Sequence, residues 1–240
     1  MAGGGTLLTF PSLIAYGVPS ITANATSTVA LVPGSFGAFW GYRKEGHAPL
    51  AEDLKFLVVS SIGGLLGALA LLRVGDAVFS KLVPWLILSA TALFILQEPL
   101  RKWNERRSKN VDAAEMDPNQ GFSKRILVGQ FFIGLYGGFF GAGSGILMLA
   151  ALGFFGMRNM HQMNRLKNLA NVAFNTVASI TFIIGRHVDW KLAAIMMVGA
   201  IVGGYGGAGI AKKIGQQNVK RLVIVVGITM GVYTLAKIYA

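Results

Sequence analysis

The chain contains no cysteine, and only 13% of its 240 residues are charged. The lack of cysteine excludes disulfides, thiolate metal sites and cysteine nucleophiles. An ordinary soluble domain has roughly a quarter charged residues, so this chain has too little charge to cover a globular surface in water. Acidic residues are fewer than basic ones, 10 against 22 lysines and arginines, and all lie between or at the ends of apolar segments. The absence of a carboxylate at mid-membrane argues against proton relay and cation binding.

Sequence signatures of catalysis are also missing. The chain has no nucleotide-binding loop, no catalytic triad pattern and no cluster of metal ligands, and its three histidines are scattered at segment boundaries. We therefore expect no enzyme activity, no cofactor and no metal site. The net charge of +12 does not indicate a nucleic-acid partner, because the cations are confined to stretches between apolar runs. Such cations typically hold loops on the cytoplasmic side of a membrane.

Apolar segments make up most of what is present, since 53% of the residues are hydrophobic and 32 are glycine. A helix needs about 20 apolar residues to cross a hydrocarbon core of roughly 30 Å, and glycine lets such helices approach closely. The hydrophobic segments are residues 5–16, 25–42, 54–72, 82–96, 126–155, 169–184, 192–210 and 222–239. They predict an all-α, multi-pass integral membrane protein. Residues 97–121 are polar and predict a linker with a short basic helix at the membrane surface.

The second half of the sequence resembles the first at an offset of about 140 residues. The glycines at 63, 64 and 67 fall on those at 203, 204 and 207, and Asn24 falls on Asn164. We expect two pseudo-symmetric repeats, residues 1–97 and 123–240, joined by a polar cytoplasmic linker, residues 98–122. Residues 126–139 have no counterpart in the first repeat, so either the chain begins within an element or further residues precede it. Placing most cations in the cytoplasm favours inverted repeats with broken or re-entrant helices.

A glycine-rich break within residues 126–155 is the first candidate for a binding site. A broken helix at membrane depth exposes unpaired N–H groups, and the N-terminus of a half-helix favours an anion. The alternative explanation is close packing of helices. The candidate substrate-binding residues are Gly141, Gly143, Ser144 and Gly145, with Gly3, Gly4, Gly5 and Thr6 as their counterparts in the first repeat.

A polar stripe that enters the following apolar segment is the second candidate. Steps of three or four residues place its members on one helical face, where Lys167 supplies charge and asparagines supply donors for an oxyanion. Alternatively, Lys167 reaches the lipid headgroups and the asparagines bond between helices. The stripe consists of Asn164, Lys167, Asn168, Asn171 and Asn175, and its first-repeat counterpart contributes Asn24, Thr26 and Ser27.

These segments resemble the TauE/SafE family of sulfite and organosulfonate transport permeases. The resemblance lies in GGGTLL and GFFGAGSGILML, in ITANATSTVALV and MNRLKNLANVAFN, and in the glycine-paired segments IGGLLGALALLR and IVGGYGGAGIAKK. It covers essentially the whole chain in two copies. It implies a duplicated multi-span permease that moves sulfur-containing oxyanions or related organic anions, often outward. We expect transport by alternating access, in the cell membrane and specifically the inner membrane of a prokaryote. A passive anion channel, a non-transporting membrane assembly subunit and a homodimeric assembly are left open at this stage.

Overall fold

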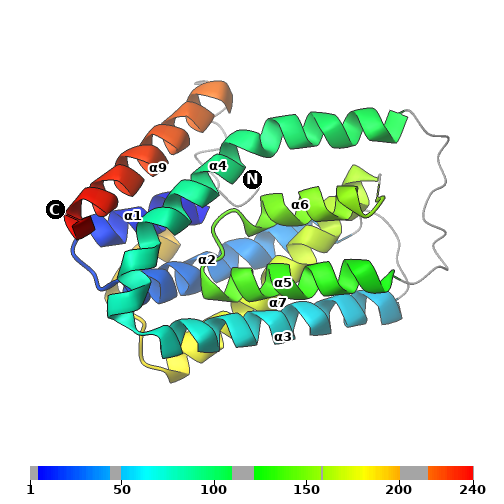
Figure 1. Ribbon diagram of the computed structural model, residues 1–240. Helices are drawn as coiled ribbons and strands as arrows, with labels where there is room; N and C mark the ends of the chain where they lie inside the picture. The colour runs from blue at the N-terminus through cyan, green and yellow to red at the C-terminus, as the bar shows by residue number, and fades with distance from the viewer. Residues whose placement is uncertain (1–4, 44–49, 110–121, 158, 201–215, 240) are drawn as a thin grey trace.

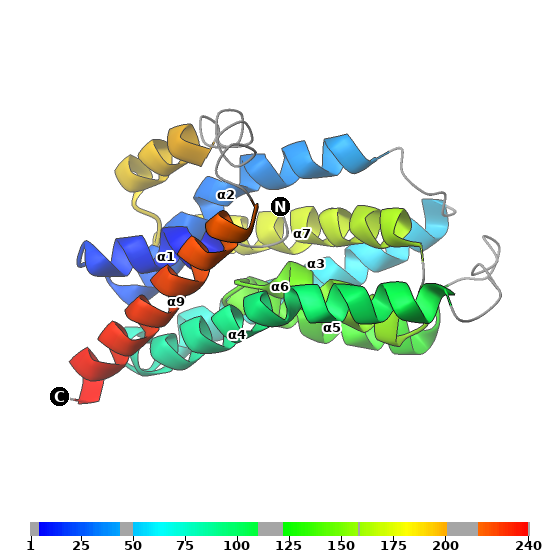
Figure 2. The same cartoon turned by 90° about the horizontal axis from the view of Figure 1, so that it is seen from above.

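The computed structural model describes residues 5–43, 50–109, 122–157, 159–200 and 216–239. This part of the chain is helical apart from short turns, and it contains no strand, which agrees with the expected all-α class. The helices are α1 (Gly5–Ala15), α2 (Ser20–Tyr42), α3 (Leu50–Val74), α4 (Asp76–Lys109), α5 (Lys124–Phe139), α6 (Ser144–Phe154), α7 (Met160–Ile184), an unlabelled helix Trp190–Ala200 and α9 (Gln216–Tyr239). Figures 1 and 2 show them in two views.

Two of these helices are long and apolar enough to cross a membrane. Leu50–Val74 has a mean hydropathy of 2.0, and Asp76–Leu100 has a mean hydropathy of 1.8. Large apolar side chains of α3, including Ile62 and Leu66, are exposed on the surface of the protein. A contiguous exposed apolar surface is unfavourable in water and suits contact with lipid.

The helix α4 differs from the expected fourth segment. Residues 82–96 were expected to end before a separate polar linker, but one helix continues from Asp76 to Lys109 and includes both Pro84 and Pro99. Prolines bend a helix without always ending it, and α4 is visibly bent in Figure 1. The predicted boundary at residue 98 therefore falls within α4, and the helix is longer at both ends than the segment predicted at 82–96. The cytoplasmic position of residues 98–122 stays a prediction.

Helices α3 and α5 lie side by side (Figure 1) and pack closely through glycine. A β-carbon added at Gly63 would lie 2.5 Å from the carbonyl oxygen of Phe131 and 2.9 Å from the backbone nitrogen of Leu135. Gly67 and Gly138 are similarly pressed against backbone atoms of the facing helix. These glycines therefore let two backbones approach, as small residues do between membrane helices.

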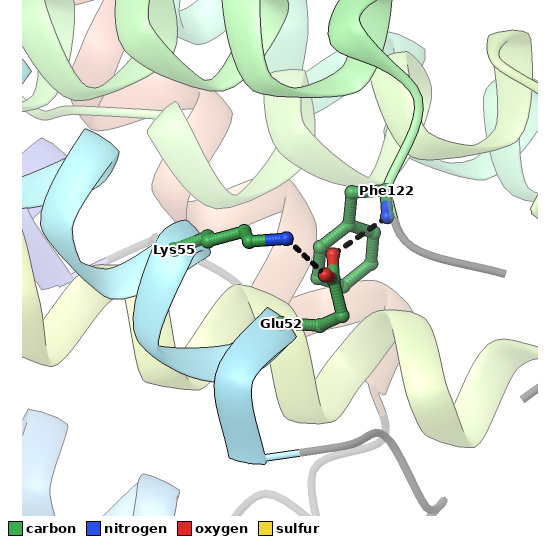
Figure 3. Close-up of polar contacts among 3 residues, drawn as sticks. All are labelled: Glu52, Lys55 and Phe122. Carbon is green, nitrogen blue, oxygen red and sulfur yellow. Dashed lines mark hydrogen bonds and ion pairs between the residues drawn. The ribbon is translucent and has the colours of Figure 1, made fainter. Parts of the chain in front are cut away.

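Glu52 joins the start of α3 to the residues that lead into α5. Its carboxylate accepts a hydrogen bond from Lys55 Nζ at 2.6 Å and another from the backbone N–H of Phe122 at 2.7 Å (Figure 3). Ser123 then caps α5, since its side chain accepts from the backbone N–H of Arg125. These contacts fix where α5 begins relative to α3.

Helices α1 and α6 end in the same hydrogen-bonded turn. After α1, Gly17 N–H donates to Ile14 and Val18 N–H donates to Leu13. After α6, Gly156 N–H donates to Gly153 and Met157 N–H donates to Leu152. This pair of bonds defines a Schellman motif, and the glycine in each has the positive φ that the motif needs, 90° at Gly17 and 97° at Gly156.

Candidate functional site

The predicted glycine break is present between α5 and α6. Helix α5 ends at Phe139, and the left-handed conformations that follow, φ 77° at Gly141 and φ 76° at Gly143, are ones that glycine adopts without steric cost. The hydroxyl of Tyr136 donates to the carbonyl oxygen of Ala142 at 2.6 Å and holds the turn.

The chain reverses direction at this break, so that α5 and α6 form a hairpin (Figure 1). A β-carbon on Gly129, near the start of α5, would lie 2.8 Å from the ring of Phe155, just after the end of α6. The two far ends of the hairpin therefore meet. The hairpin is thus present, while its re-entry on one side of a membrane stays a prediction.

The first turn of α6 lies against the polar stripe of α7. A β-carbon on Gly145 would lie 3.4 Å from Cδ of Lys167 and 3.8 Å from Nδ2 of Asn171. In this turn the N–H groups of Ser144 and Ile146 donate to the carbonyl oxygens of Gly141 and Gly143, and the N-cap Gly143 has no side chain to accept from the N–H of Gly145. The structure thus brings together a helix N-terminus, an ammonium-bearing side chain and an amide, and all three attract an anion.

Lys167 is buried, with 6% of its surface exposed, and its ammonium is held in place by a neutral group. Its Nζ donates to Oδ1 of Asn164 at 2.9 Å, and Nδ2 of Asn164 donates to the backbone oxygen of Met160 at 2.9 Å. An ammonium has three donors. The bond to Asn164 uses one of them, which leaves donors for a further ligand.

Two more asparagines of the predicted site carry buried polar atoms without a partner. Asn24 is 1% exposed, and its Nδ2 donates to the backbone oxygen of Phe139 at 3.2 Å, directly before the break, while its Oδ1 has no partner. Asn168 is 5% exposed, and its Nδ2 has no partner. Buried polar groups are normally bonded, so these two atoms are candidates for contact with water or a ligand.

Several other predicted residues have partners of their own elsewhere in the fold. The hydroxyl of Thr26 accepts from the backbone N–H of Asp189 at 3.0 Å, and Ser27 Oγ is 2.6 Å from Thr9 Oγ1. A β-carbon on Gly5 would meet the side chain of Leu31 at 3.3 Å. Binding roles for the following residues stay predictions: Thr6, Thr26, Ser27, Ser144 and Asn175. Gly3 and Gly4 lie outside the described residues.

Sequence reasoning missed the partner of Arg165. Its guanidinium binds both carboxylate oxygens of Asp53, with Nη1 2.7 Å from Oδ2 and Nη2 2.8 Å from Oδ1. Asp53 lies at the start of an apolar segment, where its sequence position suggests a solvated loop end. The two residues are 112 positions apart, so only a comparison of charges at helix ends could have suggested the pair.

Comparison with known families supplies the context of this site. The profile of the family described as "Sulfite exporter TauE/SafE" matches residues 1–234. The chain belongs to the TauE/SafE family. The resemblance found in the glycine breaks and polar segments is thereby confirmed.

Relatives of known name span most of this TauE/SafE chain. A probable membrane transporter protein of Haemophilus influenzae is 27% identical over 233 residues, which cover 96% of this chain and 86% of the relative. The probable membrane transporter protein ORF9 of a Sinorhizobium species is 27% identical over 98% of this chain and 86% of its own length. The probable membrane transporter protein YfcA of Escherichia coli K12 is 25% identical over 96% of this chain and 81% of its own length. No solved structure matches the chain.

Proposed function

We propose that this chain is a membrane carrier of small anions, with sulfite, organosulfonates or related sulfur-containing oxyanions as substrates. Family membership and the names of the relatives support a membrane transporter in place of an enzyme. The observation that carries the anion assignment is the placement of buried Lys167 and Asn171 against Gly145, at the first turn of α6. An oxyanion there would receive a charged donor from Lys167, an amide donor from Asn171 and the backbone N–H of Gly145, at the positive end of a half-helix.

The proposed carrier is built from two inverted repeats, and three pairs of contacts support the two-fold relation. Gly227 contacts Thr91, and Gly231 contacts Ile87. The offset of 140 residues relates Gly227 to Ile87 and Thr91 to Gly231, so each contact is the counterpart of the other. Contacts that map onto each other in this way are what a two-fold axis generates. They join α4 and α9, one from each repeat.

The other two pairs are matching features within the repeats, at α1 in the first and at α6 in the second. Gly5 faces Leu31 in one repeat, and Gly145 faces Asn171 in the other, again 140 residues on. The Schellman turns at Gly17 and Gly156 differ by 139 positions. In inverted-repeat transporters, substrate sites lie where broken helices of the two halves meet, and rocking of one half against the other alternates access.

Ligand-induced stabilisation of the purified protein tests the anion site. Methanesulfonate, sulfite, thiosulfate and acetate are added to native protein, to Lys167→Gln and to Lys191→Gln, a matched control in which the altered lysine is exposed. A ligand at about 100 times its Kd should stabilise the native protein by about 2.7 kcal/mol. We expect a sulfur oxyanion to raise the melting temperature of native protein and of Lys191→Gln, while Lys167→Gln folds and loses the effect.

Either failure has a defined meaning. If no anion shifts any form, the anion-carrier proposal is wrong. If Lys167→Gln keeps the full shift, anions bind elsewhere and the assignment to Gly145, Lys167 and Asn171 is wrong. In proteoliposomes, a carrier should show saturable uptake that substrate on the opposite side accelerates, whereas a channel should show neither property.

A further inference from the structure

The buried charges of the described helices balance except at one residue. Besides Lys167, the buried ionisable side chains are Glu52 and Arg165. Glu52 pairs with Lys55 at 2.6 Å, and Arg165 pairs with Asp53 through two bonds. Lys167 differs, because its one bonded partner is the neutral amide of Asn164.

Within the part of the chain that the structure describes, the helices packed against α7 supply no unpaired acidic side chain. Helix α7 packs against α2, α3, α5 and α6. The sequences of α2 and α6 contain no aspartate, glutamate, lysine or arginine. On α5, the cations Lys124 and Arg125 are exposed at its start, and Tyr136 donates to Ala142. On α3, both acids already have cationic partners, and Arg73 lies in the last turn.

The first repeat adds no second charge to this region. At the positions that correspond to Lys167 and Asn171, 140 residues earlier, the chain has Ser27 and Leu31. Ser27 bonds to Thr9, and Leu31 covers Gly5. Of the two corresponding positions, Lys167 on α7 and Ser27 on α2, only the first therefore supplies a cation.

From this balance we infer that the site at Gly145 takes anions with a single negative charge and rejects dianions. This inference rests on the proposed function and deepens it, because it names the charge of the substrate. One negative charge on the ligand neutralises Lys167. A dianion would leave one negative charge uncompensated in a buried environment, which is strongly unfavourable.

The same balance identifies which form of a titrating substrate is bound. Sulfite exists as a monoanion and a dianion that interconvert near neutral pH, whereas methanesulfonate is a monoanion and sulfate a dianion across that range. The site should therefore bind the protonated monoanion of sulfite. With the substrate bound, the site carries no net charge, and moving it within the membrane costs less than moving the empty, charged site.

Binding of three probes to the purified chain tests the inference. Affinities for methanesulfonate, sulfate and sulfite are measured by calorimetry at a series of pH values at constant ionic strength. Sulfate should bind at least about 100-fold more weakly than methanesulfonate, the ratio expected for one uncompensated buried charge. Sulfite affinity should fall about tenfold per pH unit above its second ionisation, while methanesulfonate affinity, measured at the same pH values, stays constant.

Variants and outcomes separate this inference from the proposed function. Lys167→Arg keeps the charge and should keep the preference for the monoanion, whereas Lys167→Gln should lose affinity for methanesulfonate and Lys191→Gln should not. If sulfate binds as tightly as methanesulfonate, or sulfite affinity does not fall with pH, the single-charge inference is wrong and the anion-carrier proposal survives. If none of the three probes binds, both fail together.

Discussion

The guanidinium of Arg165 on α7 donates a hydrogen bond to each carboxylate oxygen of Asp53 on α3, at distances of 2.7 and 2.8 Å. Only 7% of the arginine side chain and 20% of the aspartate side chain are exposed. The pair fastens the first turn of α3 to the early turns of α7, which also carry Lys167. By neutralising Arg165, Asp53 leaves Lys167 as the buried cation available to an anion.

Removing Asp53 alone should destabilise the protein strongly. In Asp53→Ala the guanidinium of Arg165 stays buried without its counter-charge, and we expect a loss of about 3 kcal/mol in unfolding free energy. In the double variant Asp53→Leu/Arg165→Met both charges are replaced by apolar groups of similar size, so much of that loss should be recovered. Chemical denaturation in detergent measures the three forms. Equal stability of Asp53→Ala and native protein would contradict a desolvated pair.

Two glycine-to-alanine changes should separate packing from binding. An added β-carbon at Gly67 would run into Leu135 and lie 2.8 Å from the backbone nitrogen of Phe139, so we expect Gly67→Ala to lose about 1–3 kcal/mol of stability. At Gly145 the nearest atom, Lys167 Cδ, is 3.4 Å away and belongs to a flexible side chain. Gly145→Ala should therefore fold with a stability within about 1 kcal/mol of native.

In anion binding the order should be reversed: Gly145→Ala should lose affinity, and Gly67→Ala should keep it. The methyl group of Gly145→Ala occupies space beside Lys167 and Asn171, and we expect its affinity for methanesulfonate to fall by about tenfold, roughly 1.4 kcal/mol. Gly67→Ala, assayed below its melting temperature, should bind like the native protein. Unchanged affinity in Gly145→Ala would place the ligand away from the first turn of α6.

Thr26 should contribute to the stability of the fold and not to anion binding. Its hydroxyl is fully buried and accepts the backbone N–H of Asp189 at 3.0 Å, and Asp189 in turn accepts the N–H of Leu192 at the start of the next helix. Thr26→Val leaves the part-buried N–H of Asp189 without its acceptor, which should cost about 1 kcal/mol. Affinity for methanesulfonate should not change. A loss of affinity at unchanged stability would return Thr26 to the binding site, as its sequence position predicts.

Local sequence signals predicted the elements better than the contacts between them. The break at Gly141–Gly145 could be located because three glycines at alternate positions in an apolar run indicate a break in the helix, and two of them, Gly141 and Gly143, have positive φ. The end of α4 could not, because Pro99 and the charged residues after it suggest a boundary while good helix formers there continue the helix. Propensity and pattern disagreed at that point, and the helix continued.

The candidate site shows the same limit. The helical spacing of Asn164, Lys167 and Asn171 predicted that they share a face, and Asn164 and Lys167 are in fact bonded. That this face meets Gly145 depends on tertiary packing of α6 against α7, which no local pattern encodes. The Asp53–Arg165 pair was missed for the same reason, since opposite charges on distant helices carry no sequence period.

Arg186 should be the easiest position at which to stabilise the chain. It follows α7 in a third Schellman turn, in which Arg186 N–H donates to Ile183 and His187 N–H donates to Phe182. Its φ of 57° is left-handed, a conformation that costs an ordinary residue about 1–2 kcal/mol. The corresponding turns after α1 and α6 have Gly17 and Gly156 there.

Replacement by glycine removes that strain but adds about 0.5–1 kcal/mol of backbone entropy to the unfolded chain. Arg186→Gly should therefore gain about 0.5–1 kcal/mol of unfolding free energy, the difference between the two effects. Arg186 is exposed, so Arg186→Ala, which removes the same charge and keeps the strain, is the control and should show no gain. Thermal melting of the three forms side by side decides the matter: an equal gain in both variants would assign the effect to charge, and no gain in Arg186→Gly would contradict the strained turn.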